Sequence, residues 1–255
     1  MVDPIDQAAG VLRPMEQILV FSGAGLSTES GIPDFRGPNG LWTKVDPDDF
    51  TIERWVSRRD IRSRGWKMHL DGELWGARSK VKPNQGHRAI VRLREEGKLA
   101  GVVTQNVDGL HHKSGLEDDF VAELHGNVRN SHCLSCEGRW HTETVLEWIE
   151  AGDDDPHCPL CAGMVKTDTV LFGEMLPEDE VSKASVFLAL CDAVLVVGST
   201  VSVWPAADVV LRAAQQGKPV VIVNRGETDA DNLAAVRIDA GIGKALPTLV
   251  DRILS

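Results

Sequence analysis

Four short apolar runs in this chain of 255 residues each end in a polar or glycine-containing motif. The runs are Ile18–Phe21, Gly101–Val103, Ala193–Val197 and Val220–Val223. The motifs that follow them are Ser22-Gly23-Ala24-Gly25, Thr104-Gln105-Asn106-Val107-Asp108, Gly198-Ser199-Thr200 and Asn224. Because open parallel sheets bind ligands in the crevice outside the carboxyl ends of their strands, one ligand could contact all four motifs. The pattern predicts an α/β fold with a parallel sheet and a ligand site at one edge.

Helical periodicity between these runs predicts a doubly wound sheet. We expect helices at Arg88–Glu96, Glu178–Leu190, Pro205–Gln216 and Leu246–Leu254, and a short extended piece at Thr169–Phe172. Two stretches interrupt the alternation and are interpreted as insertions: 41–82, which has helical spacing, and 125–166, which carries most of the cysteines. Five arginines of the first stretch are expected to form a solvated helix face, with contact to acidic groups of a substrate or cofactor as the alternative: Arg54, Arg58, Arg59, Arg62 and Arg64.

Charge and hydropathy restrict the partners of the chain. The formal charge of −11 disfavours non-specific binding to nucleic acid or to anionic membranes. No apolar stretch approaches the roughly 20 residues that span a bilayer, and the start of the chain lacks the apolar core of a signal peptide. We therefore expect a cytoplasmic protein that binds neither nucleic acid nor membranes.

Four of the five cysteines form two CxxC pairs separated by 21 residues: Cys133, Cys136, Cys158 and Cys161. In a reducing compartment this spacing predicts a tetrahedral zinc site, and four protein ligands leave no open position, so the metal would be structural. Two disulfides are the alternative, which a cytosolic location disfavours. His132 or His157 could also replace one thiolate. Cys191 lies in an apolar stretch and is expected in the core.

The first glycine motif belongs to a longer and more specific pattern. Gly23-x-Gly25 has the first two glycines of the dinucleotide-binding fingerprint and lacks the third, so alone it is a weak indicator. The whole run Gly23–Gly37, with Gly40-Leu41-Trp42 after it, resembles the signature of the sirtuin family, the NAD-dependent protein lysine deacylases. Further blocks follow in the family's order: Thr104–His111, Leu124-His125-Gly126, the double CxxC, Phe172-Gly173-Glu174, Gly198-Ser199-Thr200 with Pro205-Ala206-Ala207, and Asn224.

The resemblance implies a two-domain architecture. A large Rossmann-like domain with a doubly wound parallel sheet would comprise 1–40, 84–124 and 167–255. A small domain would combine a helical module, 41–83, with a zinc-binding module, 125–166. NAD and an acyl-lysine peptide would meet in the cleft between the two domains.

The resemblance also assigns roles to residues. The NAD-binding positions would be Gly23, Ala24, Gly25, Ile32, Asp34, Phe35, Arg36, Trp42, Gln105, Asn106, Val107, Asp108, Gly198, Ser199, Thr200, Asn224 and Ile242. The catalytic residues would be His125, Asn106 and Asp108, with His125 as the general base that takes a proton from a ribose hydroxyl. The substrate peptide would add as a strand near Val170, Phe172 and Gly173.

The implied activity is NAD-dependent removal of acyl groups, by default acetyl, from protein lysines, releasing nicotinamide and O-acyl-ADP-ribose. An ADP-ribosyltransferase or NAD glycohydrolase, in which another nucleophile or water captures the ribosyl group, stays open. A non-catalytic NAD-responsive binding protein is disfavoured because both Asn106 and His125 are present. The chain has no tyrosine, so it lacks the Tyr and Arg pair of members selective for succinyl or malonyl lysine.

Two departures from the family's pattern concern the cleft. The chain reads Lys166-Thr167-Asp168-Thr169 where many members have Arg-Pro-Asp-Val, and it has Gly198-Ser199-Thr200 in place of the commoner Gly-Thr-Ser. Both changes keep hydrogen-bonding capacity. The first leaves the peptide preference open.

Overall fold

A six-stranded parallel sheet forms the larger part of the computed structural model, which describes residues 3–255. Its strands lie in the order β3-β2-β1-β7-β8-β9. They are β1 (Ile18–Ser22), β2 (Leu99–Thr104), β3 (Val121–Glu123), β7 (Ala193–Val197), β8 (Val220–Val223) and β9 (Ala234–Ile238). The strand order reverses at β1: the chain first adds strands on one side, from β2 to β3, and later on the other side, from β7 to β9. Strand β1 pairs with β2 on one side and with β7 on the other. The point at which such sheets bind ligands therefore lies beyond the ends of β1 and β7.

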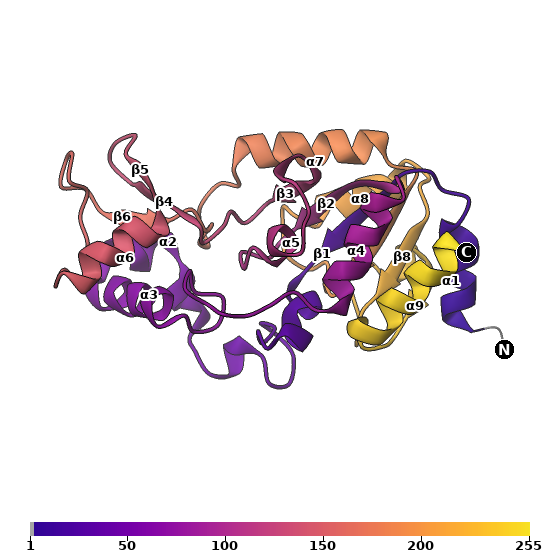
Figure 1. Cartoon of the computed structure of the whole chain (residues 1–255), viewed down its shortest axis with the longest axis horizontal. Helices are drawn as coiled ribbons and strands as arrows, with labels where there is room; N and C mark the ends of the chain where they lie inside the picture. The colour runs from indigo at the N-terminus through magenta and orange to yellow at the C-terminus, as the bar shows by residue number, and fades with distance from the viewer. Residues whose placement is uncertain (1–2) are drawn as a thin grey trace.

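Helices cover both faces of this sheet (Figure 1). One face carries α1 (Pro4–Leu12), α4 (Gln85–Glu95) and α9 (Ile242–Leu254), and the other carries α7 (Glu178–Leu190) and α8 (Asp208–Gln215). Ile18 and Val20 of β1 pack on the first set, whereas Leu19 and Phe21 pack on the second. Because both faces are buried, the strands read as continuous apolar runs instead of alternating ones.

The predicted doubly wound parallel sheet is confirmed, and its four predicted strands are present. Strands β3 and β9 lie at the two edges and were not predicted, because neither forms a continuous apolar run. The short extended piece predicted at Thr169–Phe172 forms no strand. The strand β6 (Val165–Thr167) ends before it, and Phe172 makes only an isolated bridge to Thr51.

Helix boundaries follow local capping. Helix α7 spans the predicted residues, whereas α4 begins earlier because the Asn84 side chain accepts hydrogen bonds from the backbone N–H groups of Gly86 and His87. Helix α9 begins at Ile242, one turn before the prediction, and α8 begins at Asp208 instead of Pro205. Helix α1 was not predicted. Among residues 3–255, no helix combines the length and apolar character needed to cross a bilayer.

The two stretches interpreted as insertions pack against each other at the far end of the molecule (Figure 1). The first contains α2 (Ile52–Ser57) and α3 (Arg59–Asp71), and the second contains a three-stranded antiparallel sheet, β5-β4-β6, and α6 (Thr142–Glu150). The remaining strands are β4 (Asn130–Cys133) and β5 (Arg139–His141). Trp55 and Trp66 of the first stretch share a core with Val145, Leu146 and Val165 of the second. We call this unit the small lobe.

Arg62 corrects the expectation of a solvated arginine face, because its side chain is only 9% exposed. Its Nε and Nη2 atoms donate to the two carboxylate oxygens of Asp155 at 2.7 and 2.8 Å, and Nη1 donates to the carbonyls of Trp55 and Val56. Each guanidinium nitrogen of Arg62 therefore has a hydrogen-bond partner. The Arg62–Asp155 pair joins α3 to the cysteine-bearing stretch. Its neighbour Arg58 pairs with Asp60 in solvent.

Replacing Arg62 by Met is expected to destabilise the small lobe by about 3 kcal/mol, because removing one partner of a buried pair leaves the other charge unpaired. Urea unfolding monitored by tryptophan fluorescence measures this loss. Arg58→Ala, which removes an exposed pair, is expected to leave the midpoint nearly unchanged. Equal midpoints for the two variants would contradict the role given to Arg62.

Candidate active site and metal centre

The four polar motifs meet at the carboxyl edge of the six-stranded sheet. The backbone N–H of Gly23 donates to the carbonyl of Val197 at 3.0 Å, and that of Gly198 donates to Val223 at 3.0 Å. The N–H of Gln105 donates to Ser22 at 3.0 Å, and its side-chain amide donates to the Ser199 hydroxyl at 2.8 Å. The prediction that one ligand could contact all four motifs is therefore geometrically sound.

The turns after β1 and β7 touch so closely that side chains are excluded between them. The N–H of Gly25 donates to the carbonyl of Gly198 at 2.9 Å. A Cβ atom at Gly25 would lie 2.8 Å from the Gly198 Cα, and one at Gly23 would lie 2.7 Å from the Gly198 carbonyl oxygen. Gly198 itself has a φ of +62°, which disfavours other residues. Glycine at these positions leaves bare backbone facing the cleft, as a pyrophosphate requires.

A cavity of about 690 Å³ lies between this edge and the small lobe, within the size range of ligand pockets. It is lined by these predicted positions: Gly23, Ala24, Gly25, Asp34, Phe35, Arg36, Trp42, Gln105, Asn106, Val107, Asp108, His125, Val170, Phe172, Gly173, Gly198, Ser199, Thr200 and Asn224. Ile32 and Ile242 do not line it. They are buried behind the wall, where Ile242 backs the Gly198 turn. Their assignment to NAD stays a prediction.

Asn106 and Asp108 form a buried polar group that lines the cavity. The Ser27 hydroxyl donates to the Asp108 Oδ2 at 2.7 Å, and the Asn106 amide donates to the Gly23 carbonyl at 3.1 Å. The other Asp108 oxygen accepts from the Leu110 N–H at 2.8 Å. Burial raises the pKa of Asp108 above its usual value. The group thus offers a fixed carboxyl and amide to a polar ligand.

His125 reaches the cavity from the loop after β3, and its ring orientation is set by the backbone. Its Nδ1 lies 3.1 Å from the carbonyl oxygen of Gln105, which can only accept, so Nδ1 carries the hydrogen and Nε2 keeps a lone pair. Burial lowers the pKa of His125 below 6.5, so the ring is neutral at neutral pH. This is the protonation state of a general base.

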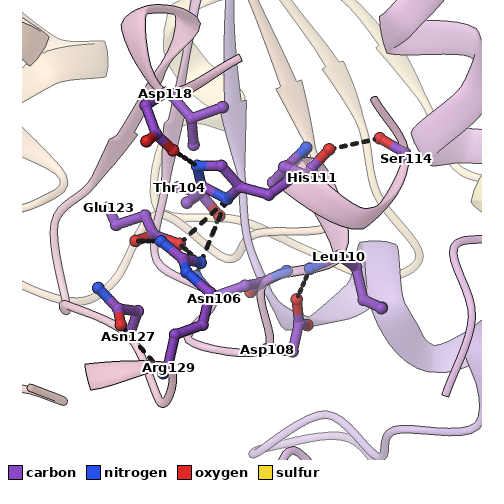
Figure 2. A network of polar contacts seen from close by, with 12 residues as sticks. Thr104, Asn106, Asp108, Leu110, His111, Ser114, Asp118, Glu123, Asn127 and Arg129 are labelled. Atoms are coloured by element: carbon purple, nitrogen blue, oxygen red, sulfur yellow. Dashed lines mark hydrogen bonds and ion pairs between the residues drawn. The ribbon is translucent and has the colours of Figure 1, made fainter. Parts of the chain in front are cut away.

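An ion pair closes the loop that carries His125 (Figure 2). Arg129 donates to both carboxylate oxygens of the buried Glu123 at 2.8 Å, and the Asn127 side chain accepts from the Arg129 N–H. Gly126, with a φ of +67°, makes the tight turn, and a Cβ there would lie 1.8 Å from the Asp168 carbonyl. The loop is therefore rigidly positioned between the sheet and the small lobe.

Several cavity residues escaped the sequence analysis. Met68, His69 and Trp75 come from the stretch 41–82, whose helical spacing carries no signal for a ligand site. Lys166 and Glu174 flank the segment predicted to bind peptide, and the unusual Lys166-Thr167 sequence was the one signal that could have drawn attention to them. Tertiary contact alone brings the helical residues to the cleft.

The four predicted metal ligands lie together. Their sulfur atoms are all within 4.8 Å of one another, with Cys133 and Cys161 at 3.5 Å and Cys136 and Cys158 at 3.6 Å. A tetrahedron with Zn–S bonds of about 2.3 Å has edges of about 3.8 Å, so this cluster fits a zinc ion. Backbone N–H groups of Ser135 and Leu160 donate to two of the sulfurs, as thiolates require. The chain forms no disulfide among the residues described, which rules out the disulfide alternative in this structure.

These features define a class: a nucleotide-binding α/β protein with a structural zinc centre and a cleft between its sheet and a small lobe. Residues 23–205 match the model of the Sir2 family. The chain therefore belongs to the Sir2 family, and the resemblance to sirtuins inferred from the sequence is confirmed.

Relatives that match this chain in sequence are named as deacetylases. The "NAD-dependent protein deacetylase" of Rhodopseudomonas palustris is 39% identical over 246 residues, covering 96% of each chain. The "NAD-dependent protein deacetylase 2" of Streptomyces coelicolor is 42% identical over 236 residues, covering 91% of this chain and 96% of the relative.

Solved structures of Sir2 proteins are similar to this chain along nearly its whole length. A Sir2 enzyme structure superposes with a TM-score of 0.89 at 36% identity and covers 100% of this chain and 99% of its own. A Sir2 complex with a deacetylated p53 peptide and 3′-O-acetyl-ADP-ribose gives a TM-score of 0.86 at 32% identity and covers 97% of both chains.

Cys133→Ser is expected to lose zinc and cooperative unfolding, because the short antiparallel sheet has few apolar residues and depends on the metal to fold. Metal analysis and thermal unfolding of the purified protein measure both. Cys191→Ser, a change outside the cluster, is expected to retain one zinc per chain. A Cys133→Ser protein that is metal-free yet unfolds like the wild type would refute a structural role for the cluster.

Proposed function

We propose that this chain removes acyl groups, acetyl by default, from lysine side chains of proteins with NAD as co-substrate, releasing nicotinamide and O-acyl-ADP-ribose. The observation that carries the proposal is the meeting, in one cavity, of the glycine turns, the buried Asn106 and Asp108 group and the neutral His125. The family and the names of its members agree with that chemistry.

Each part of the cavity has a separate role in binding NAD and excluding water. The bare backbone of Gly23, Gly25 and Gly198 accommodates the pyrophosphate, and Asp108 accepts a hydrogen bond from the carboxamide of nicotinamide. When bound, NAD supplies a ribosyl carbon whose bond to nicotinamide breaks as the acyl oxygen attaches. The apolar wall with Phe35 and Trp42, whose rings lie 5.1 Å apart, excludes water from that carbon.

His125 takes the proton that the acyl transfer releases. Its Nε2 lone pair accepts a proton from a ribose hydroxyl, and that oxygen then bonds to the acyl carbon. Water completes the reaction by displacing the lysine nitrogen, which leaves as an amine. The backbone hydrogen bond from Nδ1 to Gln105 holds the ring in the tautomer that this proton transfer needs.

The division of the chain into a Rossmann-like domain, a helical module and a zinc-binding module also belongs to this proposal. The shared core of α2, α3, α6 and β6 supports it, although residues 1 and 2 lie outside the described part. We propose a cytoplasmic location, because four zinc-binding thiolates persist best in a reducing compartment.

Mass spectrometry of a reaction containing NAD and an acetyl-lysine peptide tests the function. Formation of O-acetyl-ADP-ribose in step with deacetylated peptide is the expected result. Nicotinamide release without peptide turnover would indicate an NAD glycohydrolase, and a peptide heavier by one ADP-ribose would indicate a transferase. An absence of NAD consumption would refute an enzymatic role.

His125→Ala is expected to lower kcat by about 10²- to 10⁴-fold, because the variant has no general base. Circular dichroism and zinc content should match the wild type. His141→Ala removes an exposed imidazole of the small lobe and serves as the matched control, with activity retained. Near-normal turnover by His125→Ala would exclude the assigned role.

The pH dependence of kcat/KM should reveal the protonation of His125. Because burial lowers its pKa below 6.5, activity is expected to be complete at neutral pH and to fall only as the pH drops below 6.5. Protonated His125 has no lone pair to accept the ribose proton. An acid limb centred above 6.5 would contradict the neutral state inferred for this ring.

A further inference from the structure

Lys166 is a buried lysine that borders the cavity, and the reaction proposed above does not use it. Its side chain is only 3% exposed. The ammonium donates to the carbonyls of Thr167 and Thr169 at 3.1 and 2.6 Å and to Glu174 Oε2 at 3.0 Å. A lysine has three N–H donors, so all of them are used. These three bonds fix the position of the Lys166 ammonium beside the cavity.

Glu174 completes the arrangement from the other end of the same segment. Its Oε2 accepts from both the Lys166 ammonium and the backbone N–H of Leu171, the latter at 2.7 Å. The N–H of Glu174 in turn donates to the Leu171 carbonyl. Two side chains eight positions apart therefore hold the backbone between them. We call this pair the clamp.

The backbone between the two clamp residues is bonded toward the protein. The N–H groups of Asp168, Val170 and Phe172 donate to the carbonyls of Asn130, His125 and Phe50. Among residues 3–255, the N–H of Thr169, the carbonyls of Asp168 and Val170 and both backbone groups of Gly173 have no such partner. Val170 and Gly173 line the cavity, so their free groups are accessible to an incoming chain.

We propose that the Lys166–Glu174 clamp presents the unpaired backbone groups of Val170 and Gly173 to the substrate peptide, which makes Lys166 a positioning residue for peptide binding. The inference rests on the proposed function, since it names the part of the site that takes the peptide backbone. An extended peptide that adds to a protein edge obtains its affinity from main-chain hydrogen bonds, so the edge must hold its shape before binding. The backbone of residues 168–174 belongs to no strand, so side chains are needed to hold its shape.

The clamp also explains how the cavity tolerates the Lys166-Thr167 departure. Where Pro would limit the backbone by its ring, Thr167 leaves it freer, and its carbonyl is instead held by Lys166. The hydroxyls of Thr167 and Thr169 lie 2.9 Å apart and add a further link within the segment.

Lys166→Met keeps the length of the side chain and removes its charge and donors. We expect the KM for an acetyl-lysine peptide to rise about tenfold or more, because charge-assisted hydrogen bonds to the segment are lost. The KM for NAD should change by less than about twofold, since the glycine turns are untouched. Lys166→Arg, which restores a cation, should recover most of the peptide affinity.

Lys183→Met is the matched control. Lys183 also bonds to backbone carbonyls and to a glutamate, Glu180, but it lies away from the cavity. It should change neither KM. An unchanged peptide KM in a folded, zinc-loaded Lys166→Met protein would overturn the proposal, as would a rise in both KM values by the same factor.

Hydrogen exchange of the peptide-free, zinc-loaded protein separates this proposal from the proposed function. The segment 167–174 should exchange about tenfold faster in Lys166→Met than in the wild type, while the strands of the six-stranded sheet stay protected. Unchanged exchange would refute the clamp even if the enzyme is active. If the wild type turns over no acetyl-lysine peptide, the proposed function fails, and faster exchange would still support the clamp as the holder of this segment.

Discussion

The contact between the turns after β1 and β7 is the constraint on which the site depends. Parallel pairing of these strands brings Gly23 and Gly25 against Gly198, and the backbones approach until a Cβ atom has no room. This approach fixes the floor of the cavity and aligns Gln105 and Ser199 across it. Any larger residue would separate the strands where the dinucleotide is expected to bind.

The small lobe covers the carboxyl edge of the six-stranded sheet and so encloses the cavity. Its two parts are separated by 83–124 in the sequence, yet they share one core and the buried Arg62–Asp155 pair, whose members are 93 positions apart. The segment carrying His125 runs from the six-stranded sheet into the small lobe, and the segment containing Val170 runs back. The Val170 N–H donates to the His125 carbonyl. Peptide-binding and catalytic elements are therefore coupled by a direct hydrogen bond.

Burial sets the chemistry of the polar groups in the cleft. Removal from water lowers the pKa of His125 and raises that of Asp108, so both shifts favour uncharged forms. The hydrogen bonds from Ser27 and Leu110 oppose the second shift and keep Asp108 an acceptor. Because the Lys166 ammonium is removed from water, its charge needs Glu174 and two backbone carbonyls as partners. These bonds hold the segment predicted to bind the peptide.

The sequence by itself determined the four central strands β1, β2, β7 and β8, the zinc ligands and most of the cavity lining, because each depends on local rules: buried runs, CxxC spacing and glycine turns. It did not reveal β3, β9, the buried state of Arg62 or the clamp, and the short extended piece predicted at Thr169–Phe172 forms no strand. Those features depend on partners distant in sequence: Asp155 for Arg62, and Phe50 and His125 for the segment near Val170. Only the tertiary structure decides them, because a side chain's burial and a backbone group's partner are properties of the packed chain.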